Sequence, residues 1–398
     1  MRNAALYETA AARFRAHFGC AHRAAAYAPG RVEVLGNHTD YNEGFVLSAA
    51  IDLGTFFLAA PAPDGACRVL AADVDEEAVF QVRTPGTSAE HPWSNYVRGV
   101  LAGLAQRAQP SCGFLGMLLG NIPLGAGLSS SAALEMSAGL ALAALYGIPL
   151  APPDLARIGQ AAEHAYAGVK CGLLDQITSL FGRENALVQT DFRSLDVVNV
   201  PFGSDACFLM CDTHAKHRLV DSEYNLRRSQ CEAAVAFFAD RLPRPVRALR
   251  DVTRADWDRH ASGLDPVTAH RALHIIGENE RVRHGAERLK AGDLAGFGRL
   301  MFRSHESSRR YFENSCPELD FLVEQAARMP GVLGARLSGG GFGGSAVVLL
   351  HPRDVDHARA ALASAYRSEF GRACDVRPIL PSAGATLVDP LPGDVTTE

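Results

Sequence analysis

The stretch Asn121–Ala133 places two glycines and three consecutive serines directly before a helix-forming stretch that runs to about Tyr146. Gly125 and Gly127 allow backbone conformations that other residues rarely adopt. A helix that begins near Ser130 points unpaired amide groups, and the positive end of its dipole, at the loop. These residues therefore predict an anion site that can hold a phosphate group.

The loop is not a Walker A motif, because no lysine follows its glycines. The chain has only three lysines, Lys170, Lys216 and Lys290. The Val-Ala-Ile-Lys and Asp-Phe-Gly motifs of protein kinases are also missing from the sequence, which disfavours that class. The charge of a bound phosphate must then be balanced by arginine, a metal ion and the helix end.

A second polar site is predicted in Gly30–Gly44, where a strand that carries Arg31 runs into a turn. Polar side chains able to donate and accept in many directions crowd this turn: Asn37, His38, Thr39, Asp40 and Tyr41. Such a set suits a ligand with several hydroxyl groups. The alternative is a surface turn in which Asn42 and Gly44 only serve the geometry.

A third candidate is Asp175, which falls near the start of a helix expected over Gly172–Phe181. The other positions of that helix are apolar, so the carboxylate should lie at an edge that faces the core or a cleft. Glu163 and His164 precede this segment. The alternative is a first-turn charge that only stabilises the helix dipole.

The fourth candidate is the glycine-rich segment Leu337–Ser345, which contains a formal G-x-G-x-x-G pattern. A dinucleotide-binding loop of this kind opens a helix. Here Ala346–Leu350 follows, which favours a strand, so we expect a strand–loop–strand packed against another loop or a ligand. A glycine-rich hairpin without a ligand is the alternative.

We predict two domains, since 398 residues exceed what one core usually supports. The order of strand-like and helix-like segments favours the α+β class. We place the domains at 1–199 and 200–388, with a mobile tail at 389–398. Strands are predicted at 31–35, 46–51, 186–189, 197–200 and 207–211, and helices at 95–105, 130–146, 153–167, 172–181, 223–238 and 269–291.

The charge and hydropathy patterns indicate a partner of low molecular weight. A net charge of −5 lacks the basic footprint of proteins that bind nucleic acid or anionic membranes. The amphipathic start of the chain is not typical of a signal peptide, and no apolar run is long enough to span a membrane. We therefore expect a cytoplasmic protein, either a monomer or a weak homodimer.

Taken together and in this order, the four segments resemble the GHMP small-molecule kinases, and within them the galactokinases. Arg31–Gly44 resembles the galactokinase signature, and Leu124–Ala133 resembles the family's phosphate loop. Gly168–Gln176 is similar to the segment with the catalytic aspartate, and Gly339–Gly344 to the third motif. The likeness spans residues 20–385. It implies a two-domain fold with mixed β-sheets flanked by helices and the active site between the domains.

The resemblance implies ATP-dependent phosphorylation of the C1 hydroxyl of α-D-galactose, with Asp175 as the base and Arg31 as the residue that stabilises charge. For the sugar it points to Asn37, His38, Thr39, Asp40, Gly172 and Tyr224. For ATP it points to Gly125, Ala126, Gly127, Leu128, Ser129, Ser130 and Ser131. Ser131 and Glu163 match the family's Mg²⁺ contacts. Trp93 and Tyr96 are placed near the adenine.

One departure concerns Asn37, because galactokinases usually carry glutamate at this position. Asparagine loses the charge and a methylene, so the contact to an outer hydroxyl of the sugar should weaken or pass through water. This keeps open a kinase for N-acetylgalactosamine, L-arabinose or a uronic acid, besides a non-catalytic sensor of sugar and ATP. Ser345, where the family often has cysteine, is interpreted as a packing substitution.

Overall fold

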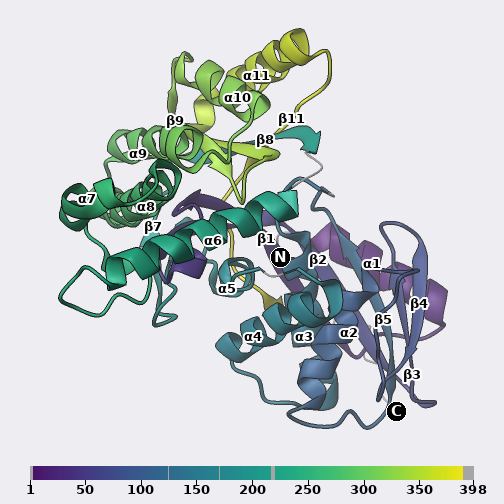
Figure 1. Ribbon diagram of the computed structural model, residues 1–398. Helices are drawn as coiled ribbons and strands as arrows, with labels where there is room; N and C mark the ends of the chain where they lie inside the picture. The colour runs from purple at the N-terminus through teal and green to yellow at the C-terminus, as the bar shows by residue number, and fades with distance from the viewer. Residues whose placement is uncertain (1–2, 124, 170, 217–219, 389–398) are drawn as a thin grey trace.

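The computed structural model describes residues 3–123, 125–169, 171–216 and 220–388, and the tail predicted at 389–398 lies outside them. Within this part of the chain, strands form an eight-stranded and a four-stranded sheet (Figure 1). Helices flank both sheets, and the long helix α6 runs across the region between the two halves of the molecule (Figure 1). This confirms the predicted α+β class with mixed sheets.

The first sheet has the strand order β12-β1-β2-β5-β3-β4, with β6 paired to β2 and β7 to β6. Only β3 and β5 run parallel among its described pairs. Its strands are β1 (Ala24–Leu35), β2 (Phe45–Ala62), β3 (Ala66–Ala71), β4 (Glu76–Gln81), β5 (Gly113–Gly120), β6 (Ala186–Asp191), β7 (Val197–Pro201) and β12 (Thr386–Leu387). The helices of this half are α1 (Ala4–Phe18), α2 (Ser94–Ala105), α3 (Ser130–Tyr146), α4 (Pro152–Ala162) and α5 (Leu174–Phe181).

The second sheet is antiparallel, with the order β11-β8-β10-β9. Its strands are β8 (Cys207–Lys216), β9 (Val332–Ser338), β10 (Gly343–Leu350) and β11 (Asp375–Ile379). Its helices are α6 (Val220–Ala239), α7 (Arg254–His260), α8 (Pro266–Lys290), α9 (Leu294–Ser307), α10 (Pro317–Ala327) and α11 (Val355–Phe370). Short turns are 3₁₀ at η1 (Asp40–Asn42), η3 (Leu249–Asp251), η4 (Ala261–Gly263) and η6 (Pro352–Asp354), and π at η2 (Glu163–Ala167) and η5 (Ser308–Phe312).

Strand alternation explains how helices cover both faces of the first sheet, because successive side chains point to opposite faces. Phe56 and Leu58 of β2 pack with α1 on one face. Phe57 and Ala59 pack with α2 and α3 on the other. Further along β1, Val32 and Val34 enter a core that the two sheets share. The residues that alternate with them, Arg31 and Glu33, therefore point the opposite way.

Each predicted element overlaps a helix or strand of the structure, but β1 and β2 are much longer than the strands predicted at 31–35 and 46–51. The stretch predicted as a helix over 153–167 is α4 followed by the π turn η2, and the helix predicted from Gly172 begins at Leu174. The glycine-rich segment is the turn between β9 and β10, as predicted. No described helix has the length and apolar character needed to cross a bilayer.

The chain passes from the first sheet to the second between Pro201 and Cys207, close to the predicted limit at residue 200. The last described residues return to the first sheet, where β12 pairs with β1 and Pro381 bridges to Ile51. The predicted second domain, 200–388, thus includes a segment that hydrogen-bonds to the other sheet.

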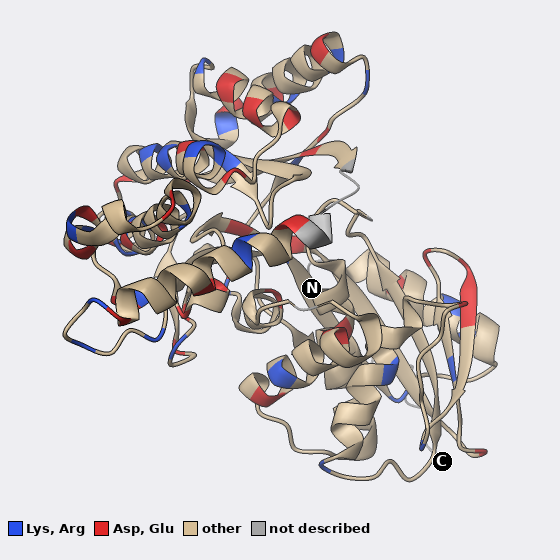
Figure 2. Cartoon of the chain, viewed as in Figure 1, with Lys and Arg blue, Asp and Glu red and all other residues tan. Residues whose placement is uncertain are grey.

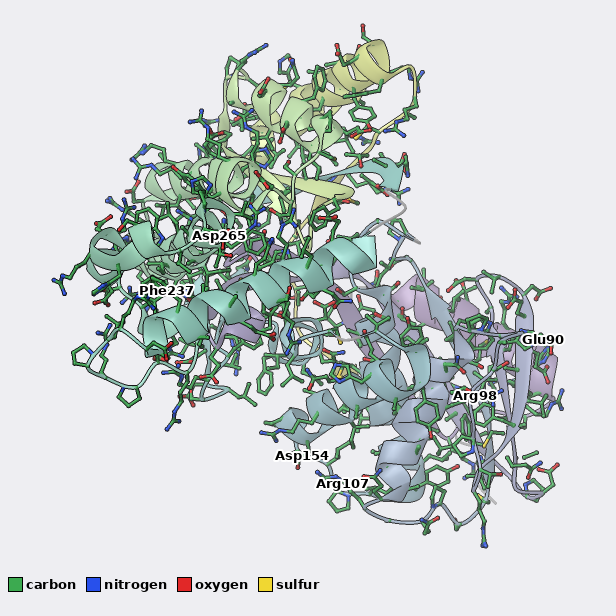
Figure 3. The ribbon with its side chains drawn as sticks, in the orientation of Figure 1. Glu90, Arg98, Arg107, Asp154, Phe237 and Asp265 are labelled. Atoms are coloured by element: carbon green, nitrogen blue, oxygen red, sulfur yellow. The ribbon has the colours of Figure 1, made fainter. Side chains whose placement is uncertain are left out.

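Charged residues of both signs are spread over the outer helices of the second half, α7 to α11 (Figure 2). In the first half, Arg107 and Asp154 form an ion pair of 3.1 Å that links the end of α2 to the start of α4 (Figure 3). This pair lies outside the cavities described below.

Candidate active site

Three segments that are far apart in sequence meet around Asp175. Its Oδ1 accepts a hydrogen bond from Arg31 Nε at 2.6 Å, and its Oδ2 accepts one from Ser129 Oγ at 2.5 Å. Arg31 Nη1 donates to the carbonyl oxygen of Gly127 at 2.7 Å. The structure therefore joins a carboxylate, a guanidinium and the Gly/Ser loop at one place.

Two cavities flank this junction, and Arg31 and Asp175 line both of them. The first cavity has a volume of about 340 Å³, and the second about 250 Å³. Because one carboxylate reaches both, a group bound in one cavity can exchange a proton with Asp175 while it faces a group bound in the other.

The second cavity is lined by every residue that was predicted to hold phosphates: Gly125, Ala126, Gly127, Leu128, Ser129, Ser130 and Ser131. Gly125 and Gly127 adopt positive φ angles of 77° and 72°, as expected from their residue type. Helix α3 begins at Ser130, so its free amide groups point into this loop. The cavity has the backbone of an anion site.

The third motif supports this loop from the other half of the molecule. Ser345 at the start of β10 is buried, and its Oγ donates to the carbonyl oxygen of Ala126 at 2.6 Å. The sequence had suggested only a packing role for Ser345. Its hydroxyl in fact ties β10 to the phosphate loop.

The first cavity is lined by residues from both halves. Arg31, Asn37, His38 and Asp40 come from β1 and the turn after it, and Gly172 precedes α5. Tyr224 of α6 and Gly339 and Gly340 of the β9–β10 turn close the opposite side. Of the six predicted sugar contacts, Asn37, His38, Asp40, Gly172 and Tyr224 line this cavity.

Thr39 lies behind the cavity wall. It is fully buried, and its Oγ1 donates to the carbonyl oxygens of Gly36 and Phe45. Its backbone carbonyl accepts from the amide of Gly44 at 2.8 Å. Thr39 therefore holds the shape of the turn that carries its neighbours.

His38 is held as a neutral ring. Its Nε2 lies 2.9 Å from the carbonyl oxygen of Gly340, to which it must donate, so Nδ1 accepts from the hydroxyl of Tyr41 at 2.8 Å. Burial lowers the pKa of His38 to about 4. The ring packs against Tyr224, with ring centres 5.0 Å apart, and so joins the turn to α6.

Asp40 and Gly172 are matched in shape. A Cβ at Gly172 would come within 1.9 Å of Asp40 Oδ2, so only glycine allows the carboxylate to lie where it does. Burial raises the pKa of Asp40 to about 6. This carboxylate is an acceptor for ligand hydroxyl groups when it is ionised.

Ser131 and Glu163 lie together, with Ser131 Oγ donating to Glu163 Oε1 at 3.0 Å. Burial, followed by the nearby Asp175 carboxylate, raises the pKa of Glu163. No group of three or more His, Cys, Asp or Glu residues suited to a metal was found in the described part of the chain. Mg²⁺ needs no such group, because it binds through one or two protein oxygens together with phosphates and water. The pair therefore fits this ion.

Sequence reasoning missed Glu33, which also lines the first cavity. The available signal was its spacing of two residues from Arg31 on a predicted strand, which puts both on one face. Cys171, Asn225, Gly339 and Gly340 line it too. Trp93 and Tyr96, placed near the adenine from the resemblance, line neither cavity, and their role stays a prediction.

Family models match three parts of the chain: the galactokinase galactose-binding signature at residues 12–61, the GHMP kinase N-terminal domain at 95–183 and the GHMP kinase C-terminal domain at 286–368. A galactokinase of Chloroflexus aurantiacus is 40% identical over 96% of this chain and 97% of its own length. One of Haemophilus influenzae is 41% identical over 87% of this chain and 90% of its own.

Solved structures agree with these matches. Lactococcus lactis galactokinase complexed with galactose superposes with a TM-score of 0.90 at 30% identity, covering 96% of this chain and 99% of that protein. The mevalonate kinase of Methanococcus jannaschii, at 17% identity and a TM-score of 0.64, covers 91% of this chain and 98% of its own, and shares the fold.

Proposed function

Because the chain belongs to the galactokinase family within the GHMP kinases, we propose that it transfers the terminal phosphoryl group of ATP to the C1 hydroxyl of α-D-galactose, with Asp175 as the base. The observation that carries this assignment of roles is that Arg31 and Asp175 line both cavities. Galactose occupies the first cavity, and the ATP phosphates occupy the second.

In this reaction Asp175 accepts the proton of the C1 hydroxyl as the sugar oxygen bonds to the γ-phosphorus. The bond between that phosphorus and the β,γ-bridging oxygen breaks, and ADP leaves. Little covalent chemistry falls to the protein, so positioning and electrostatics dominate. The hydrogen bonds from Arg31 and Ser129 fix the direction of the Asp175 carboxylate.

Arg31 acts on both partners of the transfer. Its Nε forms an ion pair of 2.6 Å with Asp175 Oδ1, which holds the carboxylate in place between the two cavities. Its planar guanidinium also lies at the wall of the second cavity, where it complements the negative charge of the transferring group. The hydrogen bond from Arg31 to the carbonyl oxygen of Gly127 fixes the position of the guanidinium relative to the phosphate loop.

Mg²⁺ would be held by Ser131 and Glu163, and when bound it neutralises phosphate charge. Glu163→Gln should raise the Mg²⁺ concentration needed for half-maximal rate by about tenfold or more, because a charged oxygen ligand is lost. Titrating Mg²⁺ at fixed ATP measures this. Glu135→Gln is the matched control, since Glu135 is also buried and also accepts from Gln176, but has no hydrogen bond to Ser131 among the described residues. Equal shifts in both variants would argue against Glu163 as the ligand.

The sugar contact at Asp40 predicts a dependence on pH. Only the ionised form of Asp40 can accept hydrogen bonds from ligand hydroxyl groups at both oxygens, because protonation turns one oxygen into a donor. The raised pKa of about 6 means that the ionised form is lost as the pH falls through that value. We expect kcat/KM for galactose to fall from about pH 7 to about pH 5, since this ratio reports groups of the free enzyme. Asp40→Asn should remove this dependence. A kcat/KM for galactose that stays constant over this pH range in the wild-type enzyme would contradict the prediction.

A panel of free sugars tests the proposed function. Initial rates with D-galactose, N-acetylgalactosamine, D-glucose, L-arabinose and D-galacturonic acid under identical MgATP should be highest for D-galactose. A higher kcat/KM for another sugar would favour that substrate. Binding of sugar and ATP without ADP release would indicate a sensor.

We also propose that the protein works as a monomer or a weak homodimer, which light scattering across a concentration series can test.

A further inference from the structure

Glu33 places a carboxylate, in addition to that of Asp175, next to the first cavity, on the face of β1 that carries Arg31. It lines the first cavity, and 4% of its surface is exposed. Its place two residues after Arg31 puts both side chains on the same side of the strand. A buried carboxylate in a ligand cavity requires partners that compensate its charge.

One oxygen of Glu33 is fully used by the protein. Oε1 accepts from Asn37 Nδ2 at 2.9 Å and from Arg336 Nη2 at 3.0 Å. Among the described residues, no group hydrogen-bonds to Oε2. This oxygen therefore remains available to a molecule in the cavity.

The amide of Asn37, by contrast, is occupied by the protein. Its Nδ2 donates to Gly339 O at 2.7 Å as well as to Glu33. Its Oδ1 accepts from Asn314 Nδ2 at 2.8 Å and from Ser308 Oγ at 3.3 Å. With two donors and two acceptor positions in use, this side chain has little left for a ligand.

The buried side chain of Arg336 explains why a negative charge is needed at Glu33. The Arg336 side chain is fully buried, and its Nε and Nη1 atoms have no hydrogen-bond partner in the described part of the chain. Glu33 is thus its counter-charge. Burial raises the pKa of Glu33, and the neighbouring Arg336 and Asn37 oppose that shift.

We propose that Glu33 is a specificity-determining residue of the sugar site, whose free Oε2 accepts a hydrogen bond from a hydroxyl of the monosaccharide. In this chain it supplies the carboxylate that galactokinases usually carry at the position of Asn37. This inference rests on the proposed function. It assigns the carboxylate of the sugar site to Glu33, four residues before Asn37.

The direct test is Glu33→Gln. Loss of a hydrogen bond to a charged group should raise the galactose KM by about 10- to 100-fold, with smaller changes in kcat and in the KM for ATP. The four monodeoxy galactoses, at C2, C3, C4 and C6, then locate the contact. The analogue that lacks the bonded hydroxyl should show the same kcat/KM in Glu33→Gln and wild-type enzyme. For the other three analogues, as for galactose, kcat/KM should be lower in Glu33→Gln than in wild-type enzyme.

A charge exchange adds an independent test. Asn37→Glu alone puts a second carboxylate beside Glu33 Oε1 and removes two donated hydrogen bonds, so the galactose kcat/KM should fall. Combined with Glu33→Gln, it reverses the direction of the hydrogen bond and keeps one carboxylate near Arg336. The double variant should therefore exceed either single variant in kcat/KM.

Several results would overturn the inference. An unchanged galactose KM in Glu33→Gln with a lower melting temperature would show that Glu33 only compensates Arg336. Uniform losses for all four analogues, or additive effects in the double variant, would do the same. If Glu33→Gln fails to fold, Glu33→Asp keeps the counter-charge but withdraws Oε2, and its galactose KM should rise. If the wild-type enzyme is inactive on galactose, the proposed function itself is contradicted. If it is active, the results with the variants test the role of Glu33 alone.

Discussion

Asp175→Asn should lower kcat for galactose phosphorylation by about 10²- to 10⁴-fold, which is the usual contribution of a positioned proton acceptor. Asparagine keeps an oxygen that can accept from Arg31 or Ser129, so the cavity walls stay in place while the base is lost. The KM for ATP and the galactose Kd should change far less than kcat. Steady-state ADP release and calorimetry measure these quantities.

The matched control is Asp154→Asn. Asp154 also lies in the first turn of a helix and pairs with an arginine, Arg107 (Figure 3), but it lines neither cavity. Its substitution should leave kcat unchanged. Full activity in both Asp175→Asn and Asp175→Ala would remove Asp175 from the mechanism.

Arg31→Met should lower kcat by about 10³-fold or more, because an arginine that stabilises a transferring phosphoryl group contributes at least that factor. The kcat of Arg31→Lys should lie between that of Arg31→Met and that of the wild-type enzyme. Lysine keeps the charge, but its single ammonium group cannot reproduce the fork that joins Asp175 to the carbonyl of Gly127. Single-turnover rates at saturating MgATP and galactose measure the chemical step.

Arg107→Lys provides the comparison, since it makes the same substitution in an arginine–aspartate pair outside the cavities. Its kcat should match wild type. If Arg31→Met had a normal single-turnover rate and only a raised KM for ATP, Arg31 would hold the phosphate loop without stabilising the transfer.

The sequence by itself determined the local parts of this protein. Two glycines and a run of serines before a helix define the phosphate loop, because positive φ angles and free helix amides are properties of neighbouring residues. The apolar helix after Leu173 places Asp175 in a first turn for the same reason. The order of the four motifs then pointed to the family.

The tertiary structure decided which of these parts touch. Arg31 and Asp175 are 144 residues apart, and Glu33 and Arg336 are 303 apart. Such contacts depend on strand register and on how the two sheets share a core, which local periodicity does not encode. Without these contacts, reasoning from the sequence predicted that Asn37 and Thr39 contact the ligand. Only packing showed that the amide of Asn37 is taken up by its neighbours, that Thr39 lies behind the wall, and that the free carboxylate oxygen belongs to Glu33.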